Sequence, residues 1–172
     1  MKRTITWITF VLSVFIFASC GASQSAAEKE AKAIEIRDAV EAFDFQFNAT
    51  YAYPTGYRSM YLSPYYDVKV SPDTVEAYLP YYGRAYRAPM DPREGGIKFT
   101  STDFDYQVSP GKRNGNWQAM IKMNDTQREI IFYFDIWENG TARLDVRDMD
   151  RQPISFQGNI EMRGKRGGSS EF

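Results

Sequence analysis

Apolar and polar residues alternate along most of this chain, from residue 43 to residue 162. A period of two is typical of strands with one face buried, and no stretch in this region has the helical pattern of a crossover connection. We therefore predict an all-β fold with eight or nine short antiparallel strands. The clearest strand is predicted over residues 43–53, with a core face made of Phe43, Phe45, Phe47, Ala49, Tyr51 and Tyr53.

Turn signals separate the predicted strands at hairpin spacing. Ser71-Pro72-Asp73 joins two valine-rich runs, and Asn139-Gly140 is a strong hairpin turn. The resulting meander either closes as a small, lipocalin-like β-barrel or folds as a β-sandwich. We rank the barrel first because long unpaired edges of apolar strands promote aggregation.

One helix is predicted ahead of the strands. Residues 25–28 have the form of a capping box, and Ala33, Ile36, Val40 and Phe43 recur at helical spacing. We expect a helix over residues 26–42 that packs a narrow apolar stripe on the domain and could also serve as a stalk. The domain is predicted over residues 26–163, with a flexible tail at 164–172.

The N-terminus has the pattern of an export signal. Lys2 and Arg3 precede an apolar run over residues 4–17, and Ala18-Ser19 lead into Cys20. This arrangement resembles a bacterial lipobox, which predicts a signal peptide over residues 1–19, an acylated Cys20 and a flexible spacer through residue 25. The alternative is an ordinary signal peptide cleaved after Ala18 or Ser19. The spacer lacks the acidic cluster that would resemble a surface-export signal of lipoproteins. We therefore expect the protein to be anchored in the outer membrane and to face the periplasm.

The composition excludes several classes of function. The chain has no histidine, and Cys20 is its single cysteine, which excludes Ser-His-Asp and Cys-His catalysis, haem held by histidine and the usual zinc sites. A net charge of −1 argues against nucleic acid as a partner. We expect no cofactor and no metal, and partners limited to the membrane and either an envelope protein or a small ligand.

The most distinctive segment spans residues 78–89, where aromatic residues and arginines continue after the strand pattern stops at Pro80. A loop with this much apolar mass either buries it or uses it for binding. In the binding interpretation, the contact residues are Tyr81, Tyr82, Arg84 and Tyr86, with Arg151 at a strand entry. In the structural interpretation, the tyrosines plug one end of the barrel, Arg84 bonds to backbone carbonyls and Arg151 stabilises a turn through Asp148 or Asp150. A second tyrosine group, which could extend the same surface or belong to an edge strand, comprises Tyr57, Tyr61, Tyr65 and Tyr66.

Catalysis by carboxylates is the enzymatic alternative, because it needs neither histidine nor cysteine. Two acids would have to lie a few ångströms apart in environments that separate their pKa values. Solvated acids in turns are the competing interpretation. The candidates are Asp91, Glu94, Asp103 and Asp105, or Asp145, Asp148 and Asp150.

Four separated blocks resemble DUF4251, a Bacteroidota family of secreted or lipid-anchored all-β proteins of unknown function. The blocks cover residues 78–86, 95–101, 139–142 and 151–158, within a resemblance that extends from Val40 to Met162. The resemblance implies the leader, the bacterial envelope and the all-β fold, and it transfers no catalytic residue. From residues and resemblance together, we expect a lipid-anchored binding or scaffolding module without catalysis. The alternatives are a carboxylate-based glycoside hydrolase and a purely structural envelope protein.

Overall fold

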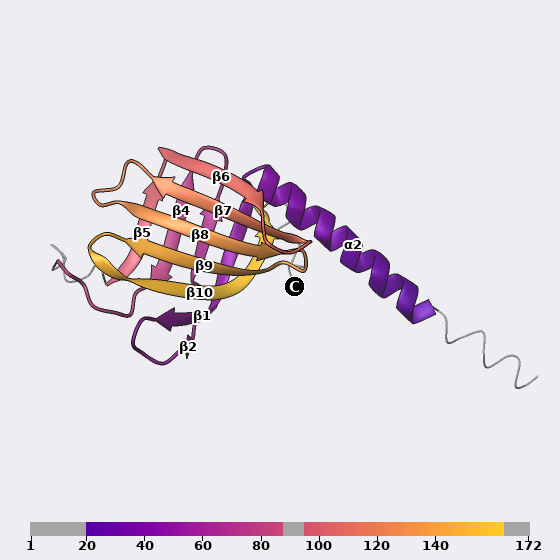
Figure 1. Ribbon diagram of the computed structural model, residues 1–172, viewed down its shortest axis with the longest axis horizontal. Helices are drawn as coiled ribbons and strands as arrows, with labels where there is room; N and C mark the ends of the chain where they lie inside the picture. The colour runs from indigo at the N-terminus through magenta and orange to yellow at the C-terminus, as the bar shows by residue number, and fades with distance from the viewer. Residues whose placement is uncertain (1–19, 88–94, 164–172) are drawn as a thin grey trace, which may run out of the picture.

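The computed structural model describes residues 20–87 and 95–163. Its elements are one helix, α2 (Cys20–Glu41), and ten strands, of which nine follow one continuous path (Figure 1). The strands are β1 (Phe45–Pro54), β2 (Met60–Tyr61), β3 (Asp67–Val70), β4 (Val75–Pro80), β5 (Gly96–Ser101), β6 (Phe104–Pro110), β7 (Asn116–Met123), β8 (Ile130–Trp137), β9 (Thr141–Asp148) and β10 (Arg151–Met162). The predicted all-β class with one N-terminal helix is confirmed.

The sheet order explains how a single sheet becomes a nearly closed barrel. Its path is β5-β4-β3-β1-β10-β9-β8-β7-β6, with every pair antiparallel and with β2 paired to β1. The two edge strands, β5 and β6, are consecutive in the chain and only residues 102 and 103 separate them. Such a short link requires the two edges to lie close together, so the sheet must curl round on itself.

A polar clasp holds the link between β5 and β6. The Asp125 carboxylate accepts hydrogen bonds from the hydroxyl of Ser101 and, at 2.8 Å, from the backbone N–H of Thr102. The Ser101 bond, with the backbone bonds adding to it, lowers the pKa of Asp125. The clasp therefore ties the β7–β8 turn to the corner at which the barrel nearly closes.

Side chains fill the inside of the barrel. Phe134 of β8 makes edge-on ring contacts with Phe45 and Phe47 of β1, at centroid distances of 5.5 and 5.6 Å. Phe99 of β5 contacts Phe132 across the interior at 5.7 Å. The described strands thus enclose a packed aromatic and aliphatic core.

A β-bulge corrects the predicted faces of β1. The register shifts between Ala49 and Tyr51, where β1 pairs with β10. Phe45, Phe47 and Ala49 point inward as predicted, but beyond the bulge Ala52 is buried and Tyr51 and Tyr53 are exposed. The extra residue, Thr50, reverses which alternate positions face the core.

Helix α2 also differs from its prediction at both ends. It begins at Cys20, so the residues expected to cap it lie inside the helix, and residues 20–25 are helical instead of forming a spacer. At the other end, Phe43 has a left-handed backbone (φ 58°) and ends the helix, so it does not belong to the first strand. The Asp44 N–H donates back to the carbonyl of Ala39 at 3.0 Å.

Only the last turns of α2 pack against the barrel. Ile36, Ala39 and Val40 are buried, whereas residues 26–35 are exposed or partly exposed. The Tyr106 hydroxyl of β6 donates to the carbonyl of Val40 at 3.0 Å, which fixes the helix end to the sheet. The remainder of α2 projects away from the domain (Figure 1).

Candidate binding surface

The segment at residues 81–87 lies across the barrel end where β9 finishes and β10 begins. Ala85 forms an isolated antiparallel bridge with Arg151. On either side of the bridge, the Tyr86 N–H donates to the carbonyl of Asp150 at 2.7 Å and the Gln152 N–H donates to the carbonyl of Arg84 at 3.0 Å. The segment is therefore fastened to β10 by its backbone.

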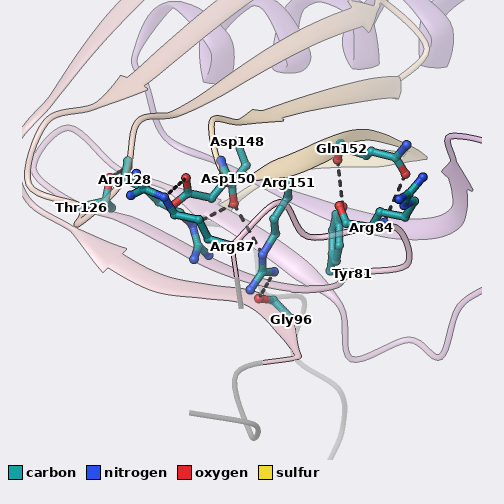
Figure 2. A network of polar contacts seen from close by, with 10 residues as sticks. All are labelled: Tyr81, Arg84, Arg87, Gly96, Thr126, Arg128, Asp148, Asp150, Arg151 and Gln152. Carbon is teal, nitrogen blue, oxygen red and sulfur yellow. Dashed lines mark hydrogen bonds and ion pairs between the residues drawn. The ribbon is translucent and has the colours of Figure 1, made fainter. Parts of the chain in front are cut away.

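Two charged residues are buried beneath this segment. Arg151 and Asp148 are 4% and 8% exposed; Asp148 continues the inward-facing alternation of β9, whereas a register shift between Arg151 and Ile154 turns Arg151 of β10 inward. Arg151 Nη1 donates to the carbonyl of Gly96 on β5 at 2.8 Å (Figure 2). Burying an arginine at the position of a core residue costs free energy unless its charge and N–H groups are paired. The contacts of Arg151 with the protein therefore stabilise the fold.

Asp148 is shared between two arginines. Its Oδ2 lies 2.8 Å from Arg128 Nε and 3.8 Å from Arg151 Nε. The Arg128 contact is an ion pair without a well-aligned hydrogen bond, because neither of its two atoms has a hydrogen-bond partner among the described residues. Sequence reasoning missed Arg128, which lies in a polar turn without any distinguishing pattern.

Tyr81 belongs to the same internal network. Its ring lies under the Arg151 guanidinium, with 4.8 Å from Arg151 Cζ to the ring centroid. Its hydroxyl lies 2.9 Å from the carbonyl oxygen of Arg84 and 3.2 Å from that of Gln152 (Figure 2). Burial raises the pKa of Tyr81. Of the two predicted ligand contacts, Arg151 is buried, whereas Tyr81 joins the network through its ring and hydroxyl and stays partly exposed.

The other three predicted contacts are exposed. Tyr82 is 36% and Tyr86 65% exposed, and the side chain of Arg84 is also at the surface. Arg84 contributes to the network through its main chain, whose N–H donates to Gln152 Oε1 at 3.2 Å. The predicted group therefore consists of one buried residue, Arg151, an external set of Tyr82, Arg84 and Tyr86, and the partly buried Tyr81 between them.

A cleft of about 830 Å³ lies beside the external set, between β4, β5 and the β7–β8 turn. Tyr66 and Tyr78 stack in its wall, with ring centroids 5.5 Å apart, and Lys98 Nζ lies 5.6 Å from the centroid of Tyr78. Lys98 is opposite Tyr78 in the β4–β5 register, a pairing that the long connection between these strands hides in the sequence. The other lining residues include Tyr81, Tyr82, Thr100, Asp125 and Gln127.

The second predicted tyrosine group is split between two places. Tyr66 lines the cleft, whereas Tyr57, Tyr61 and Tyr65 are 60%, 69% and 77% exposed. Tyr61 makes an edge-on contact with Tyr51 of β1 at 5.3 Å between centroids.

Each described candidate acid already has a protein partner. Asp145 bonds to Arg143 at 2.9 Å, Asp150 lies 3.8 Å from Arg87, and Asp148 is held as above. Asp103 and Asp105 both accept from the amide of Asn124, at 3.3 and 3.4 Å. Asp91 and Glu94 lie outside the described residues.

The described residues form neither a metal-binding cluster nor a membrane-spanning helix. Within residues 20–87 and 95–163, no three acidic or cysteine side chains are grouped as a metal site would require. In those same ranges, no helix combines the length and the apolar character needed to span a bilayer. Cys20 is the first residue of α2, whereas the predicted leader and tail lie outside the described part of the chain.

Comparison with known proteins gives a family and no activity. The family model described as a domain of unknown function, DUF4251, matches residues 27–160. The chain belongs to the DUF4251 family. A crystal structure of a DUF4251 family protein from Bacteroides eggerthii has a TM-score of 0.57 and 12% identity, with 77% of this chain and 88% of that chain covered. No curated protein matches the chain. The DUF4251 relative supports the fold, and the function must be inferred from this chain's own residues.

Proposed function

We propose that this DUF4251 protein is a lipid-anchored, non-catalytic binding module of the cell envelope. The observation that carries the proposal is the contrast between the inside of the barrel and the surface of the domain. The inside is filled by core residues, whereas eight of the eleven large hydrophobic side chains exposed among the described residues are tyrosines. Tyrosine offers a large contact area with a polar tip, which favours recognition at the surface over ligand storage in the barrel.

The contact surface in this proposal is the cleft beside residues 81–87. Its stacked Tyr66–Tyr78 pair gives an aromatic wall, and Lys98 and Gln127 add polar groups at the rim. A few polar groups converging on an aromatic wall are typical of small-ligand sites and of the anchor pockets of protein interfaces. The buried Arg151 network would keep this wall rigid from below.

The tether in this proposal is Cys20. Acyl chains on its thiol would hold the protein to a membrane, because each buried methylene contributes about 0.8 kcal/mol. Helix α2 would then be a stalk, since its exposed part rises about 1.5 Å per residue between Cys20 and the barrel. The occupied carboxylates of the described residues favour binding over hydrolysis as the role of the domain.

A photo-crosslinking experiment tests the binding role. The full chain is produced in a Bacteroidota host with p-benzoylphenylalanine at position 82, and cells are irradiated. Benzophenone inserts into nearby C–H bonds, so either a protein or a glycan partner gives an adduct of increased mass. We expect an adduct at position 82 that is lost when Tyr78→Ala and Lys98→Ala are added.

Position 57 provides the matched control, because Tyr57 is exposed and does not line the cleft. Benzophenone at position 57 should give no such adduct. If position 82 gives no adduct beyond that of position 57, the cleft is not a contact surface and the structural alternative is favoured.

A further inference from the structure

A second groove crosses the outer face of the barrel and shares no lining residue with the cleft. It has a volume of about 350 Å³ and runs over β1, β10, β9 and β8. Its lining consists of Tyr53, Trp137, Thr141, Ala142, Arg143 and Gln157. All of these residues lie within the strands of the sheet, so the groove is part of a rigid surface.

Strand register brings the lining residues together. Gln157 of β10 lies opposite Arg143 of β9 on one side and opposite Tyr51 of β1 on the other. The bulge at residue 50 turns Tyr51 and Tyr53 outward, away from the core face on which strict alternation would place them. Bulges re-aim side chains at functional sites, and this bulge supplies one wall of the groove.

The floor of the groove presents hydrogen-bond donors in fixed positions. Arg143 donates from Nε to Asp145 at 2.9 Å and from Nη2 to Ser155 at 3.2 Å. Gln157 Oε1 accepts from the Tyr53 hydroxyl at 2.9 Å. This bond leaves the Gln157 amide N–H groups without a partner among the described residues. Donors held in this way lose little conformational entropy when a ligand binds.

Aromatic rings form the two ends of the groove. Tyr53, 43% exposed, lies at the β1 end, and the half-buried Trp137 lies at the β8 end. These strands are three positions apart in the sheet, or about 14 Å at the usual strand spacing. The edge-on pair of Tyr51 and Tyr61 continues the aromatic surface beyond β1.

We propose that this groove binds a neutral oligosaccharide. Sugar rings present flat C–H faces that pack on Tyr53 and Trp137, and hydroxyl groups that accept from Gln157 and Arg143. The charge on Arg143 is balanced by Asp145, so the groove offers no net attraction to an anionic chain. Its only aliphatic lining residue, Ala142, is fully buried, so the groove does not offer the apolar centre typical of a protein interface.

Titration of the purified full chain with neutral hexasaccharides tests this inference. The probes are β-1,4-glucan, α-1,4-glucan, β-1,4-mannan and β-1,4-xylan hexamers, and polygalacturonate is the anionic comparison. At least one neutral probe should bind, and Trp137→Ala should weaken its binding at least tenfold. Gln157→Ala, at an exposed position, should weaken it several-fold and provides a test if Trp137→Ala does not fold.

The control is Tyr65→Ala, since Tyr65 is 77% exposed and lies outside the groove. It should bind the same probe as the unaltered protein does. The inference is overturned if none of the four neutral hexamers binds, if polygalacturonate binds more tightly than all of them, or if Gln157→Ala binds as well as Tyr65→Ala. None of these results would affect an adduct at position 82, so the two proposals fail separately.

Discussion

Gly158 of β10 lies close to the backbone of β1, where it pairs with Ala49. A β-carbon at this position would collide with the carbonyl oxygen of Asn48 and lie 3.0 Å from Cε2 of Phe47. The first neighbour is backbone and cannot move aside without disturbing the bulge that follows it in β1. Only glycine fits here, and the reason is steric and not conformational.

Gly158→Ala should therefore destabilise the domain by about 2–3 kcal/mol, because an added methyl group forces the two strands apart. Urea unfolding followed by circular dichroism measures the change. Gly95→Ala is the matched control, since a β-carbon there meets nothing within 4 Å. Equal stability of the two variants would contradict the close approach of β1 and β10.

Single residues were the hardest features to predict from the sequence. Tyr81 and Arg151 have the composition of a binding site, yet Arg151 is buried in the barrel end, and Tyr81 both contacts Arg151 and lines the cleft. A sequence cannot distinguish an exposed arginine from one that reaches a carbonyl on a distant strand, because the distinction depends on β5 and β10 being close in space. The contacts of Arg128 and Lys98 could not be predicted from the sequence for the same reason.

Elements were predicted better, since a period of two is a local property. The nine strands of the main path agree with the predicted eight or nine, and hairpin turns lie at residues 71–73 and 139–140 as predicted. The bulge in β1 was not predicted, because the residue at the bulge is Thr50 and not the glycine that often marks such a site. The start of α2 was misplaced because residues 20–25 continue the helix ahead of the expected capping box.

The join between α2 and β6 gives a prediction on pH. Burial raises the pKa of Tyr106 well above its ordinary value of about 10, so the folded protein keeps the phenol neutral. Above pH 10 the unfolded chain loses this proton while the folded chain retains it, and the free energy of unfolding therefore falls as pH rises. Below pH 10 both states are protonated and Tyr106 contributes no pH dependence.

The free energy of unfolding should fall by up to roughly 1.4 kcal/mol per pH unit above pH 10 because of Tyr106, and Tyr106→Phe should remove this loss. At neutral pH the variant should be about 1 kcal/mol less stable, because the hydrogen bond to Val40 is missing. Urea unfolding at pH 7, 10 and 11 measures both effects. An unchanged slope between pH 10 and 11 would show that Tyr106 is not buried against α2.

At the scale of the whole molecule, the sequence predicted the fold class but not the strand order. Hairpin spacing fixes which consecutive strands pair, but β1 and β10 pair across nearly the whole domain. That pairing places β1 in the middle of the sheet and brings the two edges together at residues 102–103. Whether the inside would be a cavity or a core depended on side-chain volumes summed over all strands, which only the structure provides.

The proposed tether at Cys20 determines where the proposed cleft would meet its partner. If acylation of Cys20 holds the domain to a membrane, Cys20→Ala should abolish that attachment. The variant should appear in the soluble fraction of the producing cells, while the unaltered chain sediments with membranes. Tyr57→Ala, in the same experiment, should stay with the membranes.

The most direct measurement is the mass of the N-terminal peptide of the protein purified from membranes. The account predicts a mature chain that begins at Cys20 and carries a diacylglyceryl group on its thiol. A chain that retains Met1, or an unmodified Cys20 thiol, would contradict it.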